Sequence, residues 1–275
     1  MEWSKIKNIV LIILLLVNGF LLVSVAGQEM KSAQYQRETR QGAVAVLREG
    51  GITMDEDALP KGEPRLQPLS LVRDQAGEQK IAETLLGAVE RTDEGGRVSY
   101  TGPGGEGWFR SNGEFGFTLE PGSQSAAGAD PTQHIIALLA QGGMTTMAVP
   151  NVAAAAEGQT LVTLRQTLGD RPIFSANIVA VYEGEALVSV QKQRAAVAMS
   201  AGKGGQPLDV ATVLIRFYGG IRSGGHVCST VKRLTPGYWA SAEPNGTSTL
   251  GLVWQIVTDA GTFYVDGMTG DMTAG

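Results

Sequence analysis

A run of 21 residues without a charged side chain lies near the start of the chain and restricts what that part can become. It covers residues 8–28, follows Lys7, ends before Glu29 and is mostly aliphatic. As an α-helix it would be about 31 Å long, close to the roughly 30 Å hydrocarbon core of a bilayer. A backbone inside lipid must satisfy its own hydrogen bonds, so the run predicts one transmembrane helix over residues 8–28.

The charges beside the run predict its orientation. Lys5 and Lys7 precede it, and short basic flanks tend to stay in the cytoplasm. We therefore expect residues 1–7 to be a cytoplasmic leader and the region after Gln28 to lie outside the cell membrane. A cleaved signal peptide is the alternative, because the small residues ending at Ala26 would suit a signal peptidase. Both alternatives export most of the chain.

One polar side chain interrupts the apolar run. Asn18 lies in its middle, beside Gly19. An amide in hydrocarbon favours a hydrogen bond to a neighbouring helix, and glycine lets two helices approach closely. Asn18 and Gly19 are therefore the predicted membrane-helix contact. The alternative is an amide that bonds to the backbone of its own helix.

Composition describes a folded region without an evident cofactor or nucleic-acid partner. The chain is 43% hydrophobic and 18% charged, which is typical of globular proteins, and its formal charge of −5 comes without a concentrated basic segment. Cys228 is the single cysteine, so we expect no internal disulfide. His134 and His226 stand far apart without ligands at metal spacing. We expect no metal, no cofactor and no nucleic acid.

Periodicity and turn residues predict an α+β fold in which short helices pack on antiparallel sheets. The 37 glycines, most of them between periodic segments, indicate many turns. Asn112-Gly113 between two aromatic-rich runs predicts a β-hairpin. Pro68 places the strand near 66–71 at a sheet edge. We expect helices at 29–50, 78–89, 131–141 and 208–218, and further strands at 161–168, 173–182, 186–191, 252–258 and 262–266.

The small, polar segment from Gly122 to Asp130 predicts a boundary between two subdomains. The first, residues 29–125, would begin with a helical stalk, and the second would cover residues 126–275. Both halves have a helix, strands and an aromatic hairpin, with Trp108 in one and Trp254 in the other. This similarity suggests a degenerate duplication.

Two ends of the chain resemble one family. The opening "MEWSKIKNIVLIILLLVNGFLL" resembles the start of YycI-type proteins, and "RQTLGDRPIFSANIVAVYEGE" is similar to a strand pair of that family. The close, "TPGYWASAEPNGTSTLGLVWQIVTDAGTFYVDGMTG", resembles the YycI ending and PepSY-like modules generally. Its pattern residues, which we interpret as core and turn positions, are Gly237, Tyr238, Trp254, Ile256, Tyr264, Asp266 and Gly270.

The resemblance implies an anchored extracytoplasmic regulator without a catalytic residue. Such a protein would act with a YycH-like partner on a membrane sensor histidine kinase that controls cell-wall homeostasis in Gram-positive bacteria. The alternative is a secreted PepSY-like binding module for a peptide, a protease or a cell-wall fragment. The two differ in whether the predicted transmembrane helix, residues 8–28, is retained in the mature protein.

One motif suggests chemistry. Ser229 and Lys232 match the Ser-x-x-Lys signature of penicillin-binding proteins. The companion Lys-Thr-Gly box is missing from the sequence, and the flanking residues Val227 and Val231 favour a strand, whereas the nucleophile of that family starts a helix. We therefore expect a protein that is not an enzyme.

Overall fold

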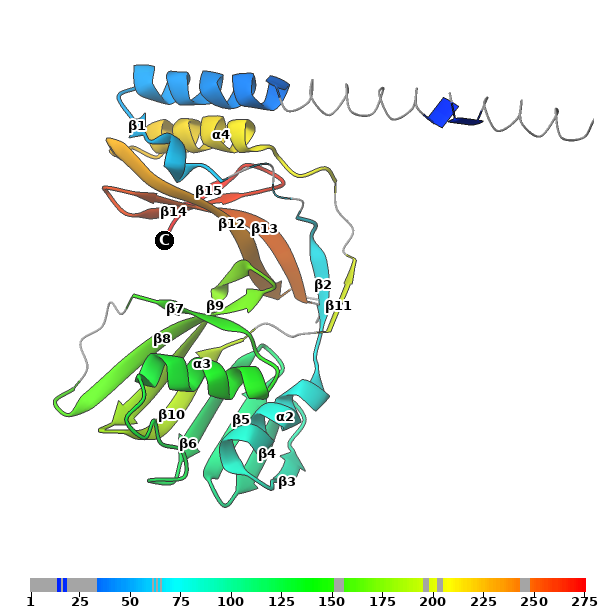
Figure 1. The fold of residues 1–275 in the computed structure, drawn as a ribbon, viewed down its shortest axis with the longest axis vertical. Coiled ribbons are helices and arrows are strands. Elements are labelled where there is room, and N and C mark those ends of the chain that lie inside the picture. Colours follow the sequence, from blue (N-terminus) through cyan, green and yellow to red (C-terminus); the bar gives the residue numbers. More distant parts are fainter. Residues whose placement is uncertain are drawn as a thin grey trace, which may run out of the picture.

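The structure is a computed structural model in which two lobes lie one above the other (Figure 1). The lower lobe is residues 75–193, and the upper lobe combines residues 34–72 with residues 198–275. The residues described are 14, 15, 17, 18, 34–60, 62, 64, 66–150, 156–194, 198–201, 205–242 and 248–275.

The described chain repeats one pattern three times: a helix, then four strands that each pair antiparallel with the next. The first unit is α2 (Gln75–Leu86), β3 (Glu90–Asp93), β4 (Arg97–Gly102), β5 (Gly105–Arg110) and β6 (Glu114–Leu119). The second is α3 (Pro131–Gln141), β7 (Thr146–Val149), β8 (Gln159–Leu168), β9 (Arg171–Glu183) and β10 (Ala186–Gln193). The third is α4 (Val210–Ser223), β12 (Thr230–Ala242), β13 (Ser248–Thr258), β14 (Thr262–Asp266) and β15 (Met272–Ala274).

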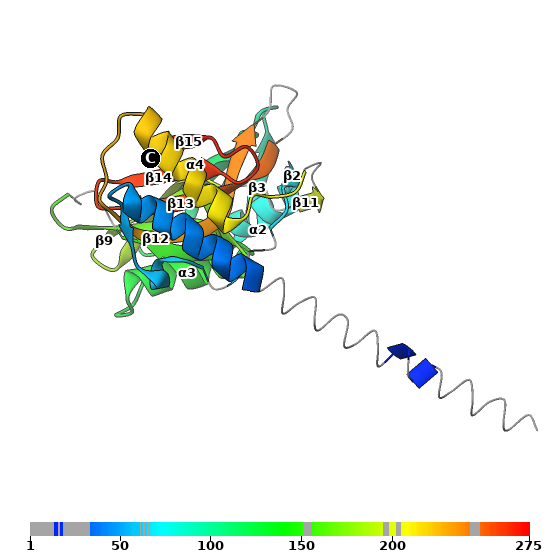
Figure 2. The same cartoon turned by 90° about the horizontal axis from the view of Figure 1, so that it is seen from above.

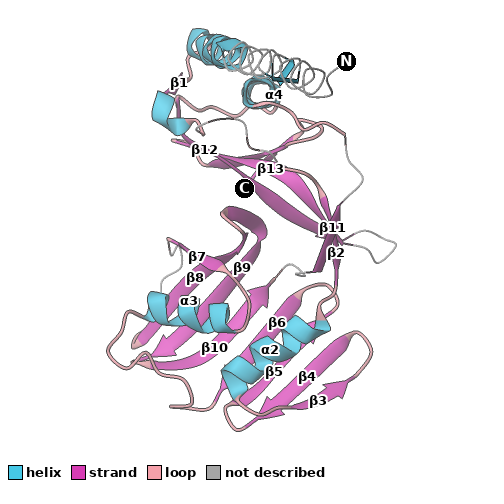
Figure 3. Ribbon diagram, turned by 45° about the vertical axis from the view of Figure 1, so that its right-hand side comes forward, coloured by secondary structure: helices cyan, strands magenta, loops and turns pink. Residues whose placement is uncertain are grey.

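The first two units form the lower lobe. Their last strands, β6 and β10, pair antiparallel, so the sheet runs β3-β4-β5-β6-β10-β9-β8-β7. Helices α2 and α3 contact each other and cover one face of this sheet (Figure 3). Both helices begin where an aspartate caps them: Asp74 accepts from the Gly77 N–H, and Asp130 from the N–H groups of Thr132 and Gln133. One hydrophobic core lies between helices and sheet.

The upper lobe joins the third unit to the start of the chain. Strand β13 is central, with β12 on one side and β2 and β14 on the other. The segments that complete the lobe are helix 34–49, which we call the N-terminal helix, β1 (Thr53–Met54), the 3₁₀ helix η1 (Glu56–Ala58), β2 (Leu69–Val72) and β11 (Ala198–Ala201). The N-terminal helix lies beside α4 in both views (Figures 1 and 2). Its Ala43 and Leu47 are buried in the core of the third unit.

The lobes are joined in two ways. Strands β2 and β11, which lead into and out of the lower lobe, pair with each other. Strand β9 also reaches the upper sheet, where Ile173 lies beside Tyr238 of β12 in parallel register. Next to it, the Ala240 N–H donates to Ser175 Oγ at 2.8 Å. Strand β9 is therefore part of both sheets.

The structure divides the chain differently from the expected subdomains 29–125 and 126–275. Because β6 pairs with β10 and α2 contacts α3, residues on both sides of position 125 share one core. The expected pair of similar halves is replaced by three repeated units. The mixed α+β class and the hairpin at Asn112-Gly113 are confirmed.

Two local predictions were wrong for identifiable reasons. Strand β2 is flanked by β11 and β13 and is therefore not an edge; Pro68 precedes the strand and removes no ladder hydrogen bond. Helix α4 runs through Gly219 and Gly220 to Ser223. At Gly220 an added Cβ would lie 2.9 Å from the sulfur of Met272, so this glycine permits close helix–sheet contact.

The expected transmembrane span is described only in part. Residues 14, 15, 17 and 18 are helical and exposed, whereas Gly19 and most of residues 8–28 lie outside the described residues. Within the described part of the chain, no helix is both long enough and apolar enough to cross a bilayer.

Candidate functional site

The face of the lower sheet opposite α2 and α3 carries a polar surface around one tryptophan. Strand alternation sends Phe109 and Phe115 into the core and turns Trp108, Arg110 and Glu114 to the other face. This surface has a pocket of about 530 Å³. We call it the Trp108 cradle; its lining residues are Trp108, Glu114, Phe115, Ser175, Asn177, Gln191 and Lys192.

Trp108 lies flat on the neighbouring strand because that strand has a glycine at the paired position. Gly116 of β6 is in register with Trp108, and a Cβ at Gly116 would be 3.2 Å from three atoms of the indole. That separation is tighter than ordinary van der Waals contact. Gly116 therefore lets the indole cover the sheet, which leaves the ring fixed as part of the cradle floor.

Two arginines lie against the same indole. The guanidinium carbons of Arg97 and Arg110 are 5.2 and 4.8 Å from the centre of the Trp108 ring, within the range of a cation–π interaction. Arg97 and Arg110 also face each other directly across β4 and β5, and like charges in that position repel. The ring and the Arg110–Glu114 ion pair at 2.7 Å offset this repulsion. Arg97 forms no ion pair within the described chain.

The polar groups of the cradle are held by hydrogen bonds. Glu114 accepts from Arg110 and its N–H donates to Asn112 Oδ1; the Arg110 bond is the main cause that lowers the pKa of the Glu114 carboxyl, followed by Asn112. Asn177 Oδ1 accepts from Arg165 Nε at 3.1 Å, which orients the amide. Ser175 is fixed by its bond from the upper sheet. The cradle is thus preorganised by residues of both lobes.

Lys192 shows backbone strain inside the same pocket. Its φ is 117°, although it is not glycine and sits within strand β10 opposite Phe115. Such a conformation costs on the order of 1–3 kcal/mol and tends to occur at functional positions. Lys192 is exposed and lines the cradle. With Arg97 and Arg110, it gives this surface an excess of positive charge.

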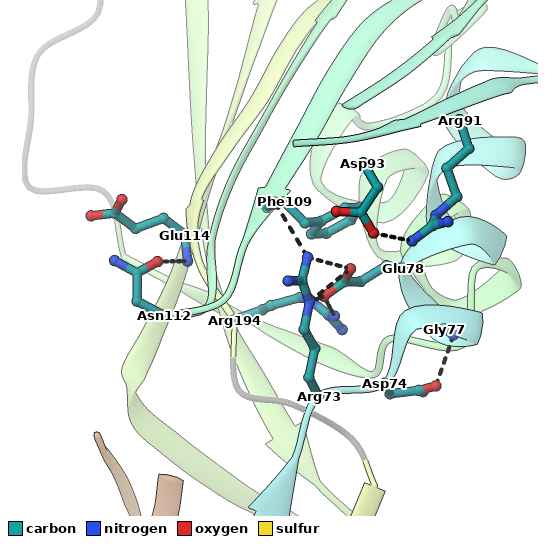
Figure 4. A network of polar contacts seen from close by, with 10 residues as sticks. All are labelled: Arg73, Asp74, Gly77, Glu78, Arg91, Asp93, Phe109, Asn112, Glu114 and Arg194. Atoms are coloured by element: carbon teal, nitrogen blue, oxygen red, sulfur yellow. Dashed lines mark hydrogen bonds and ion pairs between the residues drawn. The ribbon is translucent and has the colours of Figure 1, made fainter. Parts of the chain in front are cut away.

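A buried ion triad fixes the cradle from beneath, at the point where the chain passes between the lobes (Figure 4). Glu78 of α2 accepts from Arg73, which follows β2, at 3.0 Å and from Arg194, which follows β10, at 2.8 Å. Glu78 and Arg194 are 2% and 3% exposed. The Arg194 guanidinium also lies 4.9 Å from the centre of the Phe109 ring, on the strand that carries Trp108. Desolvation is the main cause that lowers the pKa of Arg194.

These contacts suit the binding of a ligand. The cradle offers an aromatic ring with amide and hydroxyl groups, and the arginines Arg97 and Arg110 lie against that ring. A pocket with few oriented polar groups is typical of a ligand site. Within the described residues, no group of three or more His, Cys, Asp or Glu side chains is arranged to hold a metal ion.

The residues of the family pattern lie elsewhere, in the third unit. Trp254 and Ile256 face the core under α4 and the N-terminal helix. Tyr238 is buried beside β9. At Gly237 an added Cβ would be 2.5 Å from the Pro172 carbonyl oxygen, so glycine allows β12 and β9 to approach.

The rest of the pattern shapes the end of β14. Asp266 Oδ1 accepts from the N–H groups of Met268 and Thr269, and Gly270 has a φ of 80° in the same turn. Tyr264 lies on the other face of the sheet, 5.1 Å from Trp239 and 5.4 Å from Phe174 between ring centres. The structure thus brings the pattern residues into one meander but not into one pocket. Asn18 is helical and exposed, far along the chain from them.

Ser229 has a different partner from the one its motif suggests. Its hydroxyl donates to Asp259, and its N–H and that of Thr230 donate to the same carboxylate. The Ser229 hydroxyl is the main cause that lowers the pKa of Asp259 to about 2, and a carboxylate with so low a pKa is a poor general base. Lys232 lies in strand β12, at the irregularity between Val231 and Arg233, and is exposed.

Sequence reasoning did not select the cradle. The available signal was the alternation "GEGWFRSNGEFGF", which places Trp108 and Arg110 on one strand face. The pairing of Arg97 with Arg110 and the position of Gly116 under the indole depend on strand register. Ser175, Asn177 and Lys192 come from the second unit, so only the β6–β10 pairing brings them to Trp108.

Comparisons with known proteins identify no family for this chain. No protein-family model and no curated protein matches the sequence. An uncharacterized protein from Eubacterium rectale has a similar structure, with 9% identity, a TM-score of 0.47, and coverage of 81% of this chain and 89% of that one. The Bacillus megaterium YpeB C-terminal domain also matches, at 9% identity and a TM-score of 0.37, covering 74% of this chain and 98% of that domain. At these TM-scores neither likeness supports a functional argument.

Proposed function

We propose that this chain is a membrane-anchored extracytoplasmic regulator that modulates a two-component sensor histidine kinase of cell-wall homeostasis, together with a YycH-like partner. The proposal takes its partners from the YycI-like sequence resemblance and its topology from the uncharged run 8–28. One structural observation supports it above others. The N-terminal helix, which follows that run in the chain, is fixed in the upper lobe by Leu47, 0% exposed, and by Ala43.

Because Ala43 and Leu47 hold the N-terminal helix in the core of the upper lobe, a rotation or tilt of this helix would be passed to that lobe. If the anchor pairs with a kinase helix through Asn18, a bond of about 0.6–2 kcal/mol would bias a two-state kinase without dominating assembly. Asn18→Leu should change expression of the kinase's target genes while leaving protein level and folding intact. Val17→Leu, at the neighbouring described position, is the matched control. Equal output from both variants would remove helix pairing from the proposal.

A second experiment tests the coupling itself. Two alanines inserted between Gln28 and Glu29 would turn the following helix by about 200°, whereas seven would return it to nearly the same face. Regulation through an oriented helix predicts loss of output with two alanines and retention with seven. Equal effects of both insertions would refute coupling by helix orientation.

The second candidate function is a secreted PepSY-like binding module for a peptide, a protease or a cell-wall fragment. The Trp108 cradle supports this candidate, because a preorganised surface pocket can bind a ligand without a membrane anchor. Intact mass of the native protein separates the candidates. A mass that starts at Met1 supports the anchored regulator, and a mass that starts at Gly27 supports the secreted module.

Both candidates act by binding. The engagement of Ser229 by Asp259 supports this view, because a carboxylate with a pKa of about 2 is a poor general base for the serine. Incubation with a labelled penicillin should give no covalent adduct. An adduct that disappears in Ser229→Ala would establish a catalytic serine and contradict both proposals.

A further inference from the structure

The N-terminal helix borders a second pocket, away from the cradle. It lies between this helix and the segment from β1 to Pro60 and has a volume of about 530 Å³. Its floor is apolar, formed by Val44, Met54 and Leu59. Along its helix side are Arg37, Arg40 and Arg48. We call this pocket the arginine groove.

The charges of the arginine groove are unbalanced. Asp55 is the acidic side chain in its lining, against three arginines. Arg40 donates to the Pro60 carbonyl oxygen at 3.1 Å, which ties the groove's two walls together. Arg37 and Arg48 are exposed and make no ion pair within the described chain. The groove therefore presents two available guanidinium groups, one toward each end.

The spacing of these two groups defines what fits between them. Arg37 and Arg48 are eleven residues apart on one helix, which is three turns and about 16 Å. Two acidic side chains that are eleven residues apart on an amphipathic partner helix have the same separation as these two arginines. Apolar side chains on the intervening turns would then meet Val44, Met54 and Leu59, as in other helix-in-groove complexes. Arginine also binds carboxylates in bidentate geometry.

We propose that the arginine groove binds an amphipathic helix of a partner protein, with two acidic side chains about three turns apart and apolar side chains between them. The charge complementarity and the apolar floor support a helix over a flat anionic membrane surface, which would not enter a concave pocket. This inference deepens the proposed regulator, because it gives the partner contact a chemistry and a place. It rests on that proposal only for the partner's role in signalling.

Selection from a library of displayed 18-residue helical peptides tests the proposal, with the full chain held in neutral-lipid nanodiscs. We expect enriched peptides to carry acidic residues at eleven-residue spacing around an apolar stripe. Resynthesised with a fluorescent label, they should bind at least ten-fold more weakly to the Arg37→Gln/Arg48→Gln variant, and more weakly in high salt. Arg233→Gln, an exposed charge on β12 outside the groove, should bind them as the native chain does.

Several results would overturn the groove proposal: no enriched peptide, enriched peptides without acidic residues, or equal binding to the double variant. Binding of the native chain to vesicles with anionic lipid, lost in the double variant while no peptide is selected, would assign the groove to membrane lipid instead. The groove and the regulator fail separately. If the double variant loses peptide binding but leaves kinase output unchanged, the groove is a binding site that takes no part in the regulation.

Discussion

Removing the charge of Glu78 should destabilise the fold more than a substitution at an exposed residue does. This carboxylate neutralises two arginines, Arg73 and Arg194, which lie on the two segments that connect the lobes. In Glu78→Gln, Arg194 stays 3% exposed without a counter-ion, and its Nη1 already has no hydrogen-bond partner within the described residues. Breaking a buried ion pair on one side costs about 3–5 kcal/mol. With a urea m-value of about 3 kcal/mol/M, the unfolding midpoint should fall by at least about 1 M.

The assay is urea unfolding of the full chain followed by circular dichroism. Glu83→Gln is the matched control, since Glu83 is exposed on the same helix and surface changes cost within about 0.5 kcal/mol. Glu78→Leu combined with Arg194→Met should regain most of the loss, because an apolar pair of similar volume needs no counter-charge. If Glu78→Gln unfolds at the same urea concentration as Glu83→Gln, the triad does not hold the lobe junction and the reasoning fails.

Four further predictions concern backbone fit and acid stability. Gly237→Ala should lower the free energy of unfolding in the urea assay by about 1–3 kcal/mol, because the added Cβ would lie 2.5 Å from a backbone oxygen of β9. Gly251→Ala on the next strand is the control: its Cβ has room, so the free energy of unfolding should change by no more than about 0.5 kcal/mol. Lys192→Gly should raise the free energy of unfolding by about 1 kcal/mol, because glycine adopts the positive φ without strain. A lower free energy of unfolding in this variant would contradict the backbone strain at Lys192. Asp259 has a folded-state pKa of about 2, below its ordinary 3.8, so its stabilisation is complete above about pH 4 and disappears as the pH falls to about 2. Thermal melts of native protein and Asp259→Asn should therefore differ at pH 6 and converge near pH 2. Burial lowers the pKa of His134, so its contribution is constant above pH 6.5 and stability falls below that pH; His134→Gln should reduce this fall.

The sequence predicted local elements well wherever periodicity and turn chemistry agree. Residues 131–141 form a helix as expected, with Asp130 at its N-cap and a proline at its first position. Strand 262–266 was also placed correctly, and the expected strand 252–258 lies within β13, which carries Trp254. These signals are local, so they can be read before any tertiary contact is known.

What the sequence did not predict depends on pairing between distant strands. The Gly122–Asp130 segment looks like a linker because it is small and polar, yet it is a surface loop inside one lobe, and β6 and β10 pair across it. Gly219-Gly220 looks like a helix stop because composition does not reveal Met272 beside the helix. The cradle and the ion triad were missed for the same reason: their members become neighbours only when register and topology are known.

Strand β9 gives the two lobes a single backbone. Ser175 and Asn177 of the cradle lie two and four residues beyond Ile173, which is paired with the upper sheet. The N-terminal helix is fixed on that same upper sheet's core. The route from the cradle to the N-terminal helix therefore runs along paired strands and through one packed core, and closing one lobe onto the other would break it. If the chain is the regulator proposed above, a ligand in the cradle would act through the N-terminal helix, so the orientation of this helix relative to the upper sheet is the quantity to measure.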